Sequence, residues 1–265
     1  MNLVALLAGA GFAQAQTPPA PAPVPIVPAP APQEVSVSTK LDIVSWADTI
    51  RELRVRAGGK DIVCTAEAFE YSKPISYSGS NILEFRLTPQ VSPTGKSNSG
   101  APVSSSDPKV PLTELEKRRK KDPSIVALAL LPTGSNRATV LMAPATAGTF
   151  NTFVIDDDPS KLPPGKLRIH NYCNFPIAVR CNRKEVSELK PKATAIVQTV
   201  DNGVIYELSY WNEGKWIMQE NNIIRVEPTE QVQLVVLKSD AGFFASSDGS
   251  RGGFVQTVTL RRNKL

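Results

Sequence analysis

Histidine occurs once in the sequence, and this single imidazole, His170, limits the hydrolytic chemistry that the chain could perform. A serine or cysteine nucleophile needs a base beside it, and that base would have to be His170. The alternating stretch Leu167-Arg168-Ile169-His170 predicts a strand, with His170 on the face opposite Leu167 and Ile169. No G-x-S-x-G elbow accompanies it. We therefore expect a solvent-facing strand histidine and a protein that is not an enzyme.

The 25 acidic residues leave carboxylate chemistry open, although nothing in their spacing singles out a pair. A carboxylate-based hydrolase is therefore kept as an alternative. The run Asp156-Asp157-Asp158 offers oxygen ligands to calcium, but Pro159 follows it and no glycine turn spreads the ligands. An acidic linker between domains is the favoured interpretation, and we expect neither a metal nor a cofactor.

Aromatic residues are densest around Trp211 and Trp216, with Tyr206 and Tyr210 just before them. Asn212-Glu213-Gly214 predicts a hairpin turn between the two tryptophans. Exposed and coplanar tryptophans would indicate a carbohydrate-binding module, with Tyr210, Trp211 and Trp216 as contact residues. Alternation of Tyr206 and Tyr210 along one strand face would instead place these rings in a core.

A basic cluster at 117–121 is the second candidate binding surface. The segment 112–121 predicts a short helix, because Thr113 and Glu116 are spaced as a capping box. Cations at its carboxyl end could contact anionic lipid, lipopolysaccharide or acidic glycan, or simply be solvated. No aromatic residues interleave with them, so nucleic acid is not an expected partner. The cluster comprises Lys117, Arg118, Arg119, Lys120 and Lys121.

Three cysteines, an odd number, predict at least one free thiol. The stretch 176–179 reads as a strand that would hold Cys173 and Cys181 apart. We expect Cys64, Cys173 and Cys181 to be buried free thiols, with a Cys173–Cys181 disulfide as the alternative that is not favoured.

These residues lie in a chain that reads as all-β. Short runs rich in Val, Ile, Leu, Thr and Phe alternate with Gly, Pro, Asn and Asp clusters, and we count about fifteen candidate strands. That number suits two β-sandwiches better than one. Examples are 62–65, 82–87, 125–131, 204–210, 232–237 and 254–260.

The chain also resembles itself. Lys40, Leu41 and Ile43 match Lys166, Leu167 and Ile169 at an offset of 126 residues. Further blocks match at offsets of 124, as Val55 and Val179 do, and 123, as Phe85 and Leu208 do. Ordered matches predict a tandem repeat.

The boundaries follow from composition. Residues 1–15 predict a signal peptide cleaved after Ala15, and residues 16–34, which hold eight prolines, predict a disordered stalk. We expect a first β-sandwich domain at 35–158 and a second at 159–265. An insertion at 90–123, polar at first and then helical at 112–121, interrupts the first domain.

One segment adds a resemblance. The stretch 162–171, reading LPPGKLRIHN, is followed by a Pro-Ile-Ala-Val strand at 176–179 and by Leu189-Lys190-Pro191. This pattern resembles exported bacterial β-sandwich (Ig-like) domains of unknown function. The resemblance implies a sandwich fold and export, and it implies no catalytic residues.

Together these features predict an exported, non-catalytic binding or scaffolding protein of the cell envelope. We expect it in the periplasm, at the cell surface or outside the cell. Its partner would be an envelope protein, a glycan or an anionic surface. No run of 18 apolar residues follows the leader, so no transmembrane span is expected in the mature chain.

Overall fold

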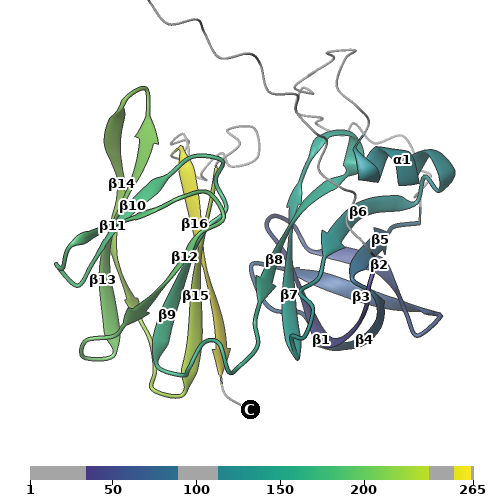
Figure 1. Cartoon of the computed structure of the whole chain (residues 1–265), viewed down its shortest axis with the longest axis horizontal. Helices are drawn as coiled ribbons and strands as arrows, with labels where there is room; N and C mark the ends of the chain where they lie inside the picture. The colour runs from purple at the N-terminus through teal and green to yellow at the C-terminus, as the bar shows by residue number, and fades with distance from the viewer. Residues whose placement is uncertain (1–33, 89–112, 239–253, 264–265) are drawn as a thin grey trace, which may run out of the picture. The chain divides into compact units, whose positions relative to one another are not determined.

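The computed structural model describes residues 34–88, 113–238 and 254–263, which form an all-β protein with one short α-helix in these ranges (Figure 1). Residues 34–265 make up one compact unit. The predicted signal peptide, the stalk up to residue 33 and residues 90–112 of the insertion lie outside the described ranges. None of the described helices is long and apolar enough to cross a membrane.

The first half of this unit contains eight strands and the helix. They are β1 (Ser36–Ser45), β2 (Ile50–Ala57), β3 (Lys60–Ala68), β4 (Ile75–Ser80), β5 (Ile82–Arg86), α1 (Glu114–Lys121), β6 (Ile125–Leu130), β7 (Arg137–Pro144) and β8 (Phe150–Asp156). All eight strands belong to one sheet, because a short parallel pairing of Val44 with Glu67 and of Ser45 with Ala68 joins β1 to β3. The first half is therefore nearly barrel-like, and it departs from the simple two-sheet sandwich expected from the sequence.

The second half contains eight further strands. They are β9 (Lys166–Asn171), β10 (Ile177–Cys181), β11 (Val186–Leu189), β12 (Thr194–Gln198), β13 (Gly203–Asn212), β14 (Lys215–Arg225), β15 (Glu230–Lys238) and β16 (Val255–Asn263). They form two four-stranded sheets, in the orders β11-β10-β13-β14 and β12-β9-β15-β16. A single buried core, with Tyr206 and Leu208 among its members, draws residues from both sheets.

Strand pairing follows the same plan in the two halves. In the first, β1 pairs with β4 and, in parallel, with β7, which pairs with β8. In the second, β9 pairs with β12 and, in parallel, with β15, which pairs with β16. Strand β2 pairs with β3 and β5, and β5 with β6, just as β10 pairs with β11 and β13, and β13 with β14. Each of the eight strands in one half thus has a counterpart in the other.

The pairing register agrees with the offsets between the sequence repeats. Val55 lies opposite Phe85, and Val179 lies opposite Leu208. These two pairs are the residues that match at offsets of 124 and 123. The parallel pairings likewise begin at Lys40 in β1 and at its match, residue 166, in β9.

A third buried cluster joins the halves. Side chains from β1, β7 and β8 pack against side chains from β15 and β16. Because successive strand residues point to opposite faces, these positions face away from the core of their own half. The cluster contains Val44, Trp46, Leu141, Ile155, Val235, Leu237 and Leu260, with Tyr71, Ala143, Phe153, Tyr172 and Val258 packed around it.

Candidate functional site

The one histidine is not exposed to solvent as the sequence suggested. His170 does lie on the face of β9 opposite Leu167 and Ile169, but that face is covered by the first half, and the side chain is 2% exposed. Its Nε2 donates a hydrogen bond to Gln233 Oε1 at 2.5 Å, and its ring stacks on Tyr172 with centroids 5.5 Å apart. Alternation correctly gave the face, while burial came from packing between the halves.

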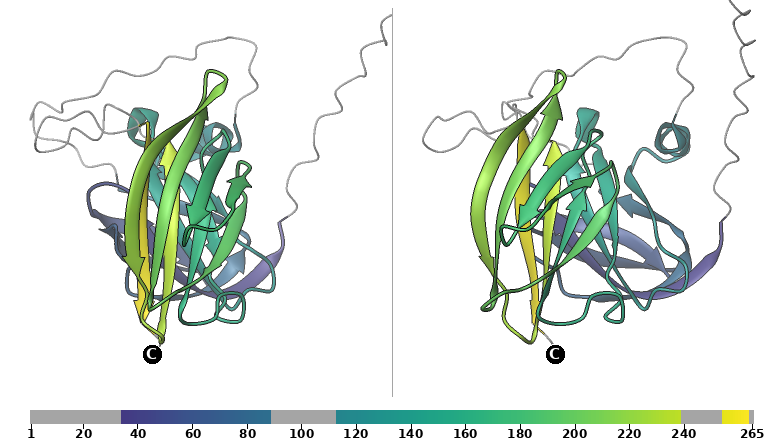
Figure 2. Two further views of the ribbon diagram at one scale, coloured as in Figure 1. Left: turned by 90° about the vertical axis from the view of Figure 1, so that its left-hand side faces the viewer. Right: turned by 60° about the vertical axis from the view of Figure 1, so that its left-hand side comes forward.

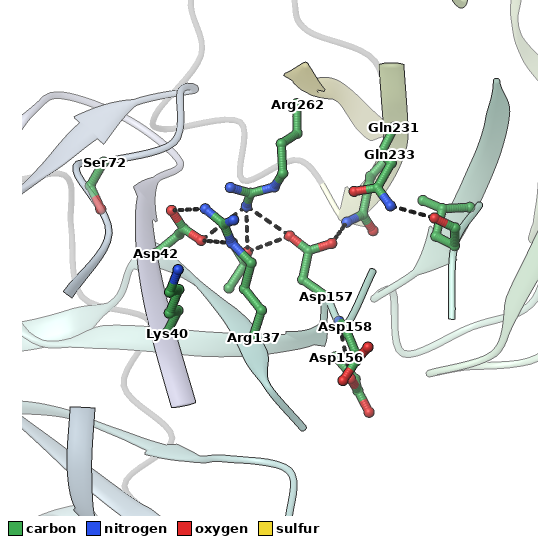
Figure 3. A network of polar contacts seen from close by, with 12 residues as sticks. Lys40, Asp42, Ser72, Arg137, Asp156, Asp157, Asp158, Gln231, Gln233 and Arg262 are labelled. Atoms are coloured by element: carbon green, nitrogen blue, oxygen red, sulfur yellow. Dashed lines mark hydrogen bonds and ion pairs between the residues drawn. The ribbon is translucent and has the colours of Figure 1, made fainter. Parts of the chain in front are cut away.

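Gln233 connects His170 to a buried ionic network between the two halves. Figure 3 shows the network from Asp42 to Gln233. Arg137 on β7 binds Asp42 on β1 through two hydrogen bonds of 2.8 and 3.2 Å. Arg262 on β16 then reaches across, with Nη2 lying 3.0 Å from Asp42 Oδ2 and 2.9 Å from Asp157 Oδ2. Gln233 donates its amide to the second oxygen of Asp157.

Two carboxylates and two guanidinium groups balance in charge within this network. The side chains of Asp42 and Asp157 are 1% and 2% exposed, so each buried charge needs a partner. Thr139 donates to Asp157 at 2.8 Å, and the guanidinium of Arg262 lies 3.8 Å above the ring of Tyr71. Each buried charge of the network is therefore paired, and its geometry fits a junction that holds the halves together.

Burial also removes the basic character that a catalytic histidine needs. Desolvation lowers the pKa of His170 to about 4, against the opposing effect of the hydrogen bond that His170 donates to Gln233. The nearby charge of Arg168 lowers it further, and that of Asp157 raises it. At neutral pH the ring is uncharged, and its Nε2 proton is committed to Gln233.

The three consecutive aspartates are parts of the structure and not a solvated linker. Asp157 lies in the network, while Asp156 accepts from Ser135 at 2.7 Å and pairs with Lys161. Asp158 caps the turn that follows, because it accepts from both the backbone and the hydroxyl of Ser160, and these bonds lower its pKa to about 2. Within the described ranges no cluster of three or more His, Cys, Asp or Glu could hold a metal ion.

The tryptophan pair lies at the end of the β13–β14 hairpin, which reaches beyond its neighbouring strands (Figure 2). Trp211 and Trp216 are cross-strand partners, each 40% exposed, and Met218 beside them is 61% exposed. The two rings meet edge to face, with centroids 5.2 Å apart and planes 67° apart. They are exposed but not coplanar. Tyr210 is buried and stacks on Phe254, so it is not part of this surface.

Helix α1 begins after the expected cap. The hydroxyl of Thr113 accepts from the backbone of Glu116, and the Glu116 carboxylate accepts from the backbone of Thr113, which completes the capping box. Arg118 is engaged within the protein, because it pairs with Glu84 and Glu34 at 2.7 Å and with Glu114 at 3.0 Å. The cations left for a partner are Lys117, Arg119, Lys120 and Lys121.

All three cysteines are free thiols. Cys173 is buried, whereas Cys64 and Cys181 are half-buried. Burial raises the pKa of Cys64 and Cys181 to about 11 and that of Cys173 to about 12. A thiol that keeps its proton at neutral pH is a poor nucleophile, so these side chains pack as small apolar groups.

Comparison with protein-family models and with curated protein sequences gave no significant match. Sequence reasoning missed two features, the buried junction and Arg168 beside it. A signal was present, because Arg168 and His170 alternate in β9 with Leu167 and Ile169, which are apolar.

Proposed function

We propose that this chain is an exported, non-catalytic binding or scaffolding protein of the cell envelope. One observation carries the proposal: a projecting hairpin ends in three exposed large apolar side chains, Trp211, Trp216 and Met218. Aromatic residues and methionine are enriched in the buried centres of protein interfaces. Their exposure at a hairpin end suits a surface that becomes covered by a partner.

The proposed architecture is two tandem β-sandwich modules, at 35–158 and 159–265, descended from one eight-stranded unit. Three blocks of sequence matches and the strand pairings that the two halves share support a duplication. An Ig-like relationship remains part of the proposal. It is supported by the resemblance of residues 162–171 and not by strand order, because the first strand of an immunoglobulin constant domain pairs with the second, whereas β9 pairs with β12 and β15.

Two sets of groups that could support hydrolysis are engaged in other contacts. His170 is uncharged and bonded to Gln233. Glu34 and Glu84 share one pocket of about 340 Å³, but the guanidinium of Arg118 lies between them and pairs with both. A general acid and a general base require carboxylates whose charges are not held by an intervening cation. These contacts favour binding over catalysis.

A binding experiment tests the hairpin end as the contact surface. The protein starting at Gln16 is labelled and sedimented with envelope fractions of its native host. Replacing a residue at the centre of an interface commonly costs 2 kcal/mol or more, so we expect Trp211→Ser/Trp216→Ser to weaken binding about thirtyfold. The matched control is Ile205→Ser/Ile223→Ser, another exposed cross-strand pair on the same hairpin.

Unchanged binding of the tryptophan variant, or equal loss in both variants, would contradict this surface. If Lys117→Ala/Lys120→Ala abolishes envelope binding, the contact surface is the helix and not the hairpin end. A glycan array separates the carbohydrate alternative. The edge-to-face angle of 67° gives a sugar no flat two-ring platform, so we expect no tryptophan-dependent glycan signal.

A further inference from the structure

A groove of about 860 Å³ lies between β8 of the first half and strands β9 and β12 of the second. Its volume is in the range of small-molecule sites. It is distinct from the hairpin end, and the proposed function does not use it. The walls combine half-buried aromatic rings with hydroxyl, amide and charged groups, which is the mixture typical of sites that take polar ligands.

The floor of the groove comes from one face of β9. Arg168 and His170 alternate along this strand, Tyr172 follows just after its end, and all three line the groove. Tyr172 packs against Phe153 of β8 with ring centroids 5.1 Å apart, and its hydroxyl donates to the carbonyl of Val154 at 3.0 Å. Aromatic groups of both halves are thus fixed side by side along the groove.

Charge in the groove is not balanced. Lys161, Arg168 and Lys192 contribute three cations, and Asp156 is the one carboxylate among the lining residues. That carboxylate is already bound to Lys161 and Ser135. Three positive charges against one negative charge leave an excess of two in the groove.

Arg168 is the unusual member of this set. It is 7% exposed, and its two terminal nitrogens donate to the backbone carbonyls of Asp156 at 3.0 Å and Lys161 at 2.5 Å. Within residues 34–88, 113–238 and 254–263 it forms no ion pair, whereas Arg137 and Arg262 each bind a buried aspartate. Buried charges in proteins are normally paired, and neutral carbonyls satisfy hydrogen bonds without cancelling the charge.

We propose that this groove binds a carboxylate-bearing sugar, with Arg168 and Lys192 facing the carboxylate and the ring of Phe153, which Tyr172 holds in place, against the sugar ring. The guanidinium has five N–H donors, of which two are used, so a carboxylate can approach the rest. Partly exposed aromatic side chains next to hydroxyl and amide groups suit the apolar face and the hydroxyl groups of a pyranose.

The single histidine provides a reporter for the groove. Because the chain contains one imidazole, its side-chain NMR signals arise from one position. The test uses the protein from Gln16 and titrates it with methyl β-D-glucuronide. The matched ligand is methyl β-D-glucoside, which differs by a hydroxymethyl group in place of the carboxylate. Acetate serves as the carboxylate without a ring.

We expect the glucuronide to shift the His170 signals saturably and to bind about tenfold or more tightly than the glucoside, as charge-assisted hydrogen bonds imply. Arg168→Gln should reduce affinity for the glucuronide about tenfold or more. Lys192→Gln, at an exposed position, should reduce it by a smaller factor while leaving the fold intact. Arg180→Gln is the control, because Arg180 is an exposed arginine that does not line the groove.

Several outcomes would overturn the proposal. These are equal affinity for glucuronide and glucoside, acetate binding as tightly as the sugar acid, unmoved His170 signals, or full affinity in Lys192→Gln and Arg168→Gln. Should Arg168→Gln fail to fold, the affinity of Lys192→Gln and the comparison of glucuronide with glucoside still test the proposal. If Trp211→Ser abolishes glucuronide binding and the His170 signals do not move, the sugar binds at the hairpin instead. If only envelope binding is lost, the proposed function of the hairpin changes and the proposal for the groove does not.

Discussion

Arg262 and Asp157 form an ion pair of 2.9 Å between corresponding positions of the two halves. Asp157 donates its backbone N–H to the carbonyl of Arg137, and Arg262 lies opposite Gln231. Arg137 and Gln231 are themselves the first β7 and β15 residues of the parallel pairings. In a symmetric pair of identical modules, a residue at such a position would meet its own copy. Opposite charges therefore mark two faces that have become complementary.

The first prediction concerns the strength of this pair. Asp157→Asn and Arg262→Gln should each lower the free energy of unfolding by about 3 kcal/mol, because each leaves the buried network with an unbalanced charge. The double variant should lose less than the sum. Urea unfolding of all four proteins measures the coupling. The exposed pair Arg180–Glu207, treated identically, should show a coupling below about 1 kcal/mol; similar couplings for both pairs would contradict the assignment.

The second prediction concerns acid stability. His170 has a pKa of about 4 in the folded protein, against about 6.5 when unfolded. Between these values the unfolded chain binds a proton that the folded chain does not, so stability falls as pH falls, by about 1.4 kcal/mol per pH unit. Groups facing the ring are Gln233, Tyr172, Arg168 and Asp157.

The measurement is urea unfolding from pH 7 to 4.5, with His170→Gln as comparison. The free energy of unfolding of the His170→Gln variant should change less over this pH range. The difference between the two curves gives the contribution of the imidazole to the pH dependence. The pKa of Asp158 is lowered to about 2, so its own contribution to stability is lost only below the pH range of this experiment. Parallel curves from pH 6.5 to 4.5 would show that the histidine is not buried uncharged.

The third prediction concerns the thiols. Because burial raises their pKa to about 11 or 12, alkylation by iodoacetamide at pH 8 should be about 100-fold slower in the native protein than in urea. Cys173 should react last. Mass spectrometry of native and denatured samples counts the modified residues. Two cysteines that resist alkylation in urea until a reductant is added would instead reveal a disulfide.

The fourth prediction concerns the anchoring of helix α1. Arg118 holds the helix to Glu84 of β5 and to Glu34. Arg118→Ala should lower the free energy of unfolding by about 1 kcal/mol, since these pairs are partly exposed. Hydrogen exchange should increase over 114–121 while the strands stay protected. Lys120→Ala, at an exposed position of the same helix, is the control and should change neither quantity.

Local features of the fold could be predicted from the sequence because they depend on neighbouring residues. The strand around His170 follows from alternation, and the helix cap follows from the spacing of Thr113 and Glu116. The same holds for the matched blocks at offsets of 126 and 123. Their apolar residues face the core at equivalent places, and strand register follows from which side chains face the core.

Contacts between the halves could not be predicted in this way. Asp157 finds Arg262 at a separation of 105 residues and Gln233 at 76, and no local pattern specifies such partners. Alternation tells which residues share a strand face, but it does not tell whether water or another sheet covers that face. This is why His170 was expected in solvent, and why the groove beside Arg168 was missed.

The junction between the halves also sets an order for maturation. Arg262 lies on β16, the last strand of the described chain, while Asp42 lies on β1, the first. During synthesis the amino-terminal half emerges first, before the strands that cover its apolar face and Asp157. Until β16 arrives, that face is open to any helper protein or to a neighbouring unfinished chain. Folding intermediates of this protein should therefore be more prone to aggregate than the finished molecule.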